Sequence, residues 1–288
     1  MIDLHIHSIC SDGSLSAEEI FKMAEEKGIE ILSITDHDNV DAYFEIEREN
    51  LSDKYKCQVI TGIELATTYG GEVIEVLGYN IDVQKMKELL DIHKMPVKES
   101  KHRLYELMLE KYTGLGAVLD ESFSKNIDFK RDIREQFMIE LSKHSENSHL
   151  FYSEGSMANL SSFLRKEVFN CDSKLFIDYS PLKPSLETVI EMVHLSGGKA
   201  FLAHTFEYSH NFLEKLESVL DEYALDGIEC YYSSFTREQT DYLLDLCERK
   251  GLLISGGSDF HGLLRPQIEL GKVIEGEKIK DSRILLWI

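Results

Sequence analysis

Short apolar strand patterns alternate with amphipathic helix patterns at both ends of the 288-residue chain, and this alternation limits the fold more than any other feature. The predicted strands cover residues 2–6, 29–34, 59–60, 73–77, 199–204, 226–231 and 252–255. The helices expected between them cover residues 16–27, 186–195 and 236–250. Strands separated by helices pair in parallel, and the reactive side chains of such α/β proteins lie at the carboxyl ends of the strands.

The middle of the chain follows a different pattern. From about residue 91 to 178 the apolar spacing is mostly helical, and the charge balance changes as well. Residues 91–180 hold 13 Lys and Arg against 15 Asp and Glu, which leaves 18 basic and 37 acidic residues in the remainder. We therefore predict a domain formed by residues 1–90 plus 181–288 and an inserted, mainly helical subdomain over residues 91–180 that recognises the substrate.

The net charge of −21 excludes several classes of function. Binding long duplex nucleic acid or an anionic membrane over a broad surface depends on clustered Lys and Arg, which this chain lacks. The start of the chain has no signal-peptide pattern, and no apolar run is long enough for a membrane span. Five cysteines without a Cys-x-x-Cys pair indicate reduced thiols and a cytoplasmic location. No feature points to an obligate protein partner.

Histidines and carboxylates gather at the ends of the predicted N-terminal strands. His5 and His7 are two residues apart, so on a strand their side chains project to the same side, as a pair of metal ligands requires. Asp12 follows in a loop, His37 stands between two aspartates after the second strand, and Glu64 follows the third. Each residue alone is also compatible with an ordinary polar residue of a loop or strand end.

The C-terminal strands end in the same residue types. His204 closes one strand pattern, and Asp259 and His261 form another pair two residues apart after the last strand. Five of the 11 histidines and three carboxylates are thus expected along one rim. Their joint placement indicates a multinuclear metal centre with nitrogen and oxygen ligands.

These motifs make the chain similar to the PHP family, the polymerase and histidinol phosphatase superfamily of metal-dependent phosphoesterases. The matching segments are Asp3-Leu4-His5-Ile6-His7-Ser8, Ser11-Asp12-Gly13, Thr35-Asp36-His37-Asp38, Gly62-Ile63-Glu64, Leu202-Ala203-His204 and Gly257-Ser258-Asp259-Phe260-His261-Gly262. The resemblance is nearest to the nucleotide and small-molecule phosphatase branch. It implies an α/β fold, a distorted TIM-like (β/α)7 barrel of about seven units with an inserted helical cap.

The resemblance also implies a role for each ligand. The implied sets are His5, His7, Glu64 and Asp259 for one divalent ion, Glu64 with His204 for a second, and Asp12, His37 and His261 for a third. A metal-bridging hydroxide held by Glu64, Asp259 and His204 is the implied nucleophile. Two or three divalent ions are therefore expected.

Glu75 marks one departure from the family pattern. The family usually has a histidine ligand two residues before Leu-Gly-Tyr, whereas this chain has Glu75 there, in Glu75-Val76-Leu77-Gly78-Tyr79. As a ligand, Glu75 would favour Mn²⁺ or Fe²⁺, with Mg²⁺ and Zn²⁺ also compatible. Alternatively, Glu75 is a plain strand residue and the second metal site is weak or empty.

The predicted substrate contacts are cationic. Arg103 matches a family arginine that opens the first cap helix, and Arg134 resembles another, although the Pro and His that should follow it are missing. Arg265 and Lys183 are further candidates near the rim of the barrel. Each of these cations is also compatible with a solvated surface. Six histidines match no motif and are read as structural or surface residues: His93, His102, His144, His149, His194 and His210.

The predicted activity is hydrolysis of a small anionic phosphorylated metabolite. A nucleotide such as a 3′,5′-bisphosphate, or a short 5′-phosphorylated oligonucleotide, is the substrate class that the resemblance favours. One alternative is hydrolysis of histidinol phosphate, which the inserted cap disfavours. Another is a catalytically degenerate, metal-binding regulatory module, which the near-complete ligand set disfavours.

Overall fold

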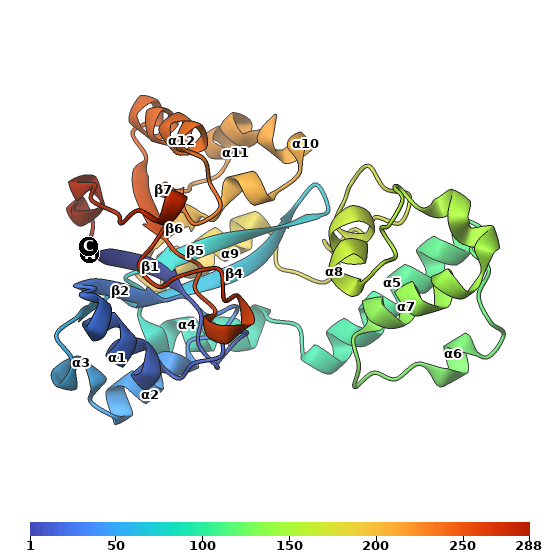
Figure 1. Cartoon of the computed structure of the whole chain (residues 1–288), viewed down its shortest axis with the longest axis horizontal. Helices are drawn as coiled ribbons and strands as arrows, with labels where there is room; N and C mark the ends of the chain where they lie inside the picture. Colours follow the sequence, from blue (N-terminus) through green and yellow to red (C-terminus); the bar gives the residue numbers. More distant parts are fainter. The chain divides into compact units, whose positions relative to one another are not determined.

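The computed structural model describes residues 1–288, and the chain divides into two compact units (Figure 1). The first unit consists of Met1–Thr67, Ile74–Lys94 and Ser185–Ile288. The second unit consists of Thr68–Val73 and Met95–Pro184.

The strands form two sheets. The first has the order β1-β2-β3 and is parallel, with β1 (Ile2–Ile6), β2 (Ile31–Ile34) and β3 (Gln58–Val59). The second has the order β4-β5-β6-β7-β8, with β4 (Gly62–Tyr69), β5 (Glu72–Tyr79), β6 (Lys199–Leu202), β7 (Gly227–Tyr232) and β8 (Leu253–Gly257). Strands β6, β7 and β8 are parallel to one another, whereas β5 and β6 are antiparallel.

The α/β class is confirmed, but the predicted distorted TIM-like barrel is not. No closed sheet is present, because the two sheets are linked only by isolated bridges between Ile6 and Phe260 and between His37 and Glu64. Strand β3 is two residues long, which is too short to carry a continuous ladder from the first sheet to the second. The antiparallel β5 is a second departure from a regular β/α barrel.

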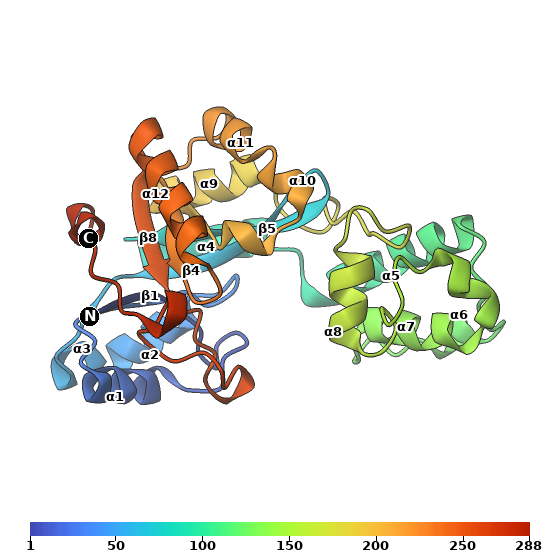
Figure 2. The ribbon, with the colours of Figure 1, turned by 45° about the horizontal axis from the view of Figure 1, so that its top comes forward.

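Helices cover the sheets of the first unit and form most of the second. Those of the first unit are α1 (Ala17–Lys27), α2 (Asp41–Arg48), α3 (Leu51–Lys54), α4 (Val83–His93), α9 (Leu186–Leu195), α10 (His210–Leu213), α11 (Leu216–Glu222) and α12 (Arg237–Lys250). Those of the second are α5 (Val97–Gly114), α6 (Phe123–Asn126), α7 (Ile133–Lys143) and α8 (Leu160–Phe163). Helix α12 packs against β7 and β8 (Figure 2).

Local sequence signals explain where α1 begins and ends. The Ser16 hydroxyl accepts the N–H of Glu19, and the Glu19 carboxylate accepts the N–H of Ser16, which completes the predicted capping box. Gly28 ends the helix in the left-handed conformation that glycine adopts without a steric penalty. Helix α12 is built in the same way, with Thr236 at its start and Gly251 at its end.

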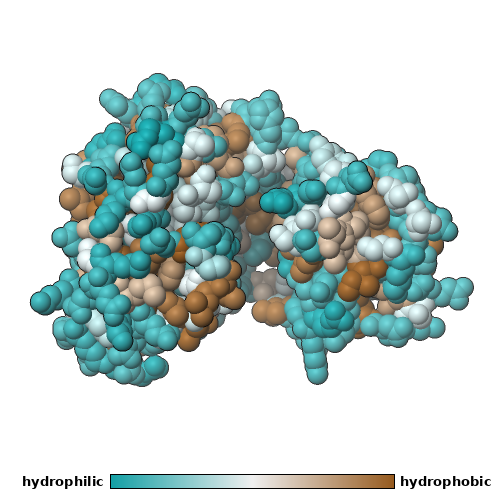
Figure 3. Space-filling model, in the orientation of Figure 1, coloured by the Kyte–Doolittle hydropathy of each residue, from teal (hydrophilic) through white to brown (hydrophobic).

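Each unit has buried apolar side chains of its own. In the first unit every residue of β1 is buried, so the strand that carries His5 lies in the core. The second unit packs around Met108, Tyr112, Phe137, Leu141 and Phe163. The face drawn in Figure 3 is mostly hydrophilic, in keeping with the strongly acidic composition. No helix combines the length and the apolarity that crossing a bilayer requires.

Candidate metal centre

His5 and His7 reach the centre of the first unit because β1 is buried along its whole length. Both side chains are fully buried, and their Nε2 atoms lie 3.1 Å apart. Backbone hydrogen bonds join the end of β1 to the segment after β8: His7 donates to the carbonyl of Phe260, and Asp259 donates to the carbonyl of His5. The two predicted i, i+2 pairs are therefore held side by side.

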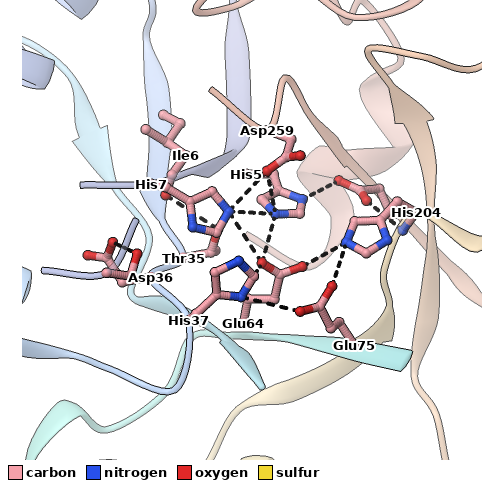
Figure 4. A network of polar contacts seen from close by, with 12 residues as sticks. His5, Ile6, His7, Thr35, Asp36, His37, Glu64, Glu75, His204 and Asp259 are labelled. Atoms are coloured by element: carbon pink, nitrogen blue, oxygen red, sulfur yellow. Dashed lines mark hydrogen bonds and ion pairs between the residues drawn. The ribbon is translucent and has the colours of Figure 1, made fainter. Parts of the chain in front are cut away.

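Glu64 occupies the middle of the cluster (Figure 4). Its Oε2 atom lies 3.3 Å from Nε2 of His5, 3.3 Å from Nε2 of His7 and 3.1 Å from Nδ1 of His37. Its Oε1 atom lies 2.8 Å from Nε2 of His204. The prediction that Glu64 ends a strand was wrong, since it is the third residue of β4 and is fully buried.

Asp259 faces two directions with its two oxygens. The Oδ1 atom points to the imidazoles, 3.0 Å from Nε2 of His7 and 3.4 Å from Nε2 of His5. The Oδ2 atom accepts hydrogen bonds from the hydroxyl of Tyr232 at 2.7 Å and from Nη1 of Arg265 at 2.5 Å. Asp259 also has a positive φ of 59°, an uncommon conformation that aspartate tolerates better than most residues.

A second group of side chains lies at the solvent side of the cluster. Atoms of His7, Asp12, His37 and His261 come within metal-binding reach of one another. Asp12 Oδ2 lies 3.2 Å from Nε2 of His261 and 3.7 Å from Nε2 of His37. The structure thus brings together Asp12, His37 and His261, the three residues expected to share an ion, and adds His7 to their group.

Glu75 lies where the family pattern places a histidine. One carboxylate oxygen is 3.4 Å from Nδ1 of His37, and the other is 3.2 Å from Nε2 of His204. Glu75, His37 and Glu64 form a further group with ligand atoms close enough to share one ion. All nine predicted ligands therefore meet in the first unit.

Burial and charge act in opposite directions on these groups in the metal-free chain. Burial lowers the pKa of His7, but the close carboxylates of Asp259 and Glu64 outweigh it and raise the pKa to about 9. Burial would raise the pKa of Glu64, yet the neighbouring His5 and His37 hold it well below its ordinary value. The pKa of Asp259 is lowered in the same way, against its burial, by His5 and His7.

The donor set fits divalent metal ions. The buried Oε2 of Glu64 has three imidazole nitrogens around it but forms no hydrogen bond of good geometry. The buried Nδ1 atoms of His7 and His204 also have no hydrogen-bond partner. Buried polar atoms of this kind are normally satisfied, and converging nitrogen and carboxylate atoms are the ligands that Mn²⁺, Fe²⁺ and Zn²⁺ accept.

Buried aspartates hold the loops that carry the ligands. Asp3 accepts hydrogen bonds from the N–H and hydroxyl of Ser258 and from the N–H of Gly271. Asp36 accepts from the N–H and hydroxyl of Ser8. These aspartates belong to the sequence motifs, yet they stabilise the loops and do not join the ligand cluster.

Two groups that contact the ligands were missed in the sequence. Glu229 contacts His5 and His204, and Tyr232 contacts Asp259. These five residues all lie in the first unit. Glu229 and Tyr232 are both on β7, which overlaps the predicted strand 226–231 and extends one residue beyond it, and no site residue was assigned to that strand. The available signal was one carboxylate in the otherwise apolar run Ile228-Glu229-Cys230.

The predicted substrate cations differ in their surroundings. Arg265 lies in the first unit, on the Oδ2 side of Asp259, with 41% of its side chain exposed. In the second unit, Arg134 makes a two-point contact with the carboxylate of Asp132, and Arg103 pairs with Glu106 on the exposed face of α5. Lys183 lies in the bend shortly before α9.

The remaining histidines stay outside the cluster, as expected. His144 belongs to another acidic group in the second unit, with Asp120 and Glu140. The ammonium group of Lys143 contacts both carboxylates, at 2.9 Å and 2.6 Å, and offsets one of their two negative charges. This group is therefore an ion-pair cluster of the second unit.

The fold and the site together define a class of α/β proteins with a buried cluster of histidine and carboxylate side chains that could hold metal ions. The family model of the PHP domain matches residues 3–238, and the chain belongs to this family. This assignment confirms the predicted family and the predicted enzyme class, a metal-dependent phosphoric-ester hydrolase.

Relatives and a solved structure extend this picture. A 5′-3′ exoribonuclease of Haemophilus influenzae is 28% identical over 295 residues, covering 99% of this chain and 97% of the relative. A 3′,5′-nucleoside bisphosphate phosphatase of Chromobacterium violaceum is 25% identical over 272 residues, covering 90% and 87%. A crystal structure from Bifidobacterium adolescentis, described as a metal-dependent phosphoesterase, superimposes with a TM-score of 0.63 at 20% identity, covering 99% and 94%.

Proposed function

We propose that this chain hydrolyses phosphate esters of nucleotides, acting on a 3′,5′-bisphosphate nucleotide or on the 5′ end of a short phosphorylated RNA. The observation that carries the proposal is the convergence of His5, His7, His37 and His204 on the buried carboxylate of Glu64. When bound, two or three divalent ions would neutralise the phosphate and lower the pKa of a water molecule at the site. The ions are expected to be Mn²⁺ or Fe²⁺.

The residues around this centre have different proposed roles in metal binding. Glu64 presents one oxygen to His204 and the other to His5, His7 and His37, which suits a carboxylate that bridges two ions. Asp259 and His204 complete the inner set. Glu75 would replace the usual histidine, which supports a preference for ions that accept oxygen ligands.

Arg265 is the proposed phosphate contact of the first unit. One of its nitrogens is engaged by Asp259, and the half-exposed guanidinium retains further N–H donors for an anion. A planar guanidinium can bind phosphate through two parallel hydrogen bonds. Arg103, Arg134 and Lys183 remain proposed phosphate contacts, although a phosphate would have to compete with Asp132 for Arg134.

Two observations favour a nucleotide over other phosphate esters. The exoribonuclease relative and the bisphosphate phosphatase relative both match over most of the chain; the first is named for cleavage of RNA and the second for a nucleoside bisphosphate. The charge of −21 still disfavours long duplex nucleic acid, because few phosphates could be neutralised outside the centre. A small anion, or the end of a single strand, requires only local positive charge.

A substrate panel tests the proposal. Purified protein loaded with Mn²⁺ would receive a 3′,5′-bisphosphate nucleotide, a 5′-phosphorylated RNA tetramer, the same tetramer with a 5′-hydroxyl, and histidinol phosphate. We expect release of phosphate from the first or mononucleotides from the second, with the 5′-hydroxyl tetramer resistant. Preference for histidinol phosphate would select the alternative function. Metal binding without hydrolysis of any phosphoester would favour the degenerate regulatory module.

A further inference from the structure

Glu229 is a fully buried carboxylate on β7, the strand between β6 and β8. His204 follows β6 and Asp259 follows β8, so β7 lies between two ligand-bearing strands but supplies no ligand of its own. Each Glu229 oxygen has one partner. Oε1 accepts a hydrogen bond from Nδ1 of His5 at 2.9 Å, and Oε2 accepts one from the backbone N–H of His204 at 2.8 Å.

We propose that Glu229 is a positioning residue that fixes the tautomer and orientation of His5 for metal binding. A neutral imidazole carries one proton, and Glu229 keeps it on Nδ1, since a carboxylate can only accept there. The lone pair of Nε2 then faces the cluster, where Nε2 lies 3.3 Å from Glu64 and 3.4 Å from Asp259. Metal-binding histidines generally donate their second N–H to such a partner.

The same carboxylate also ties the two sheets together at the site. His5 belongs to β1 of the first sheet, and His204 follows β6 of the second. Because one carboxylate accepts from a side chain of one sheet and a backbone N–H of the other, it fixes the distance between these two ligands. The role depends on both hydrogen bonds, and an uncharged replacement can supply only one acceptor.

A bulge in β7 explains how one strand reaches several ligands. The register between β7 and β8 shifts between Glu229 and Tyr231. Residues three apart normally face opposite sides of a strand, and an extra residue reverses this alternation. Glu229 and Tyr232 therefore both face the centre, where Tyr232 donates to Oδ2 of Asp259 and leaves Oδ1 toward the imidazoles.

The proposal rests on the metal centre of the proposed function, but its test measures metal binding and needs no substrate. The variant Glu229→Gln keeps the shape of the side chain, but its NH₂ group would face one of the two hydrogen-bond donors, Nδ1 of His5 or the backbone N–H of His204. We expect about 10- to 100-fold weaker affinity for Mn²⁺ and Zn²⁺ in competition with a chelator. The variant Glu229→Asp keeps the charge, and its affinity should lie between those of Glu229→Gln and the wild type.

Glu167 provides a matched control. It is also fully buried and accepts two hydrogen bonds, from the N–H of Tyr152 and the hydroxyl of Ser173, but it lies in the second unit. Glu167→Gln should lower the melting temperature and leave metal affinity unchanged. If Glu229→Gln binds metal as tightly as the wild type, the positioning role is wrong. A wild-type chain that binds no metal would overturn the metal centre itself.

If the Glu229 variants fail to fold, a spectroscopic measurement on the wild-type chain tests the same proposal. In Zn²⁺-loaded protein with ¹⁵N-labelled histidine, the ring nitrogens report which one carries the proton. The His5 signals would be assigned by their loss in His5→Gln. We expect the proton on Nδ1 and a metal-shifted Nε2. A proton on Nε2 of His5 would overturn the proposal.

Discussion

His37 and Glu64 are joined twice, once through the backbone and once through their side chains. The backbone forms an isolated parallel bridge, in which Asp38 donates to the carbonyl of Glu64 and Glu64 donates to that of Asp36. The side chains meet with Nδ1 of His37 3.1 Å from Oε2 of Glu64. This bridge links the two sheets at the metal centre, so the ligands themselves lie where a closed barrel would have continuous strand pairing.

Replacing Asp259 tests the inner ligand set. Asp259→Ala removes the carboxylate between His5 and His7. We expect a loss of more than about 100-fold in metal affinity and turnover, which is larger than the loss expected when only a hydrogen-bond partner of a ligand, such as Glu229, is changed. Far-UV circular dichroism should stay unchanged. Asp281→Ala is the control, because Asp281 pairs with Arg283 and Tyr231 away from the ligands. Near-normal turnover of Asp259→Ala would refute the ligand assignment.

Glu75 tests the departure from the family pattern. Glu75→Gln removes a charge that lies 3.2 Å from His204, and we expect fewer ions per chain by elemental analysis. Glu75→His should shift the bound metal toward Zn²⁺ when the protein is loaded from equal amounts of Mn²⁺ and Zn²⁺, because imidazole suits zinc. Unchanged stoichiometry and metal preference in both variants would return Glu75 to the role of a plain strand residue.

Local patterns account for the parts of the fold and site that the sequence predicted. The capping box of Ser16 and Glu19 and the glycine after α1 depend on residues a few positions apart, and they appear as expected. The pairs His5 with His7 and Asp259 with His261 depend only on spacing and family motif. The individual candidate ligands could therefore be read from short segments, whereas their division into sets came from the family resemblance.

Long-range pairing explains what the sequence did not predict. The partners of Glu229 lie on β1 and after β6, and no local pattern tells which carboxylate faces which imidazole. Glu64 was expected at a strand end because the motif gives no register for β4. The open sheet likewise depends on hydrogen bonds between distant strands.

The protonation of His7 predicts how pH affects the metal-free chain. Its pKa is raised from 6.5 to about 9, so its stabilising contribution is complete below pH 6.5 and is lost as the pH rises to about 9. This pKa shift corresponds to a contribution on the order of 3 kcal/mol to the free energy of unfolding at low pH. The melting temperature with chelator should fall across this range, and His7→Gln should make the fall smaller without abolishing it, because the pKa values of His5 and His204 are also raised by neighbouring carboxylates.

Metal binding should show the opposite pH dependence. A protonated His7 must lose its proton before its nitrogen can bind an ion, so metal affinity increases from pH 6.5 to about 9. The rise in melting temperature caused by Zn²⁺ should therefore grow with pH. A Zn²⁺ effect that shrinks over this interval would contradict the placement of His7 in the centre.

Arg265 tests the proposed phosphate contact. Arg265→Ala should lower kcat/KM for the best phosphoester by about 10- to 100-fold, the usual range for losing hydrogen bonds to a charged group, and Arg265→Lys should recover part of it. Metal content should stay unchanged. Arg237→Ala is the control, because Arg237 is an exposed arginine paired with Glu275 and Glu277. Equal kinetics in Arg265→Ala and the wild type would remove Arg265 from the substrate site.

Gly257 tests whether β8 must approach β1 closely to form the centre. A Cβ at this position would lie 2.2 Å from the backbone nitrogen of His5, a distance that no real contact allows. Gly257→Ala should push β8 and Asp259 away from His5, which lowers both stability and metal affinity. Gly114→Ala, at the end of α5 with no atom nearby, should be neutral or slightly stabilising. Thermal melts and metal titrations check both variants, and wild-type affinity in Gly257→Ala would show that the ligands tolerate separated strands.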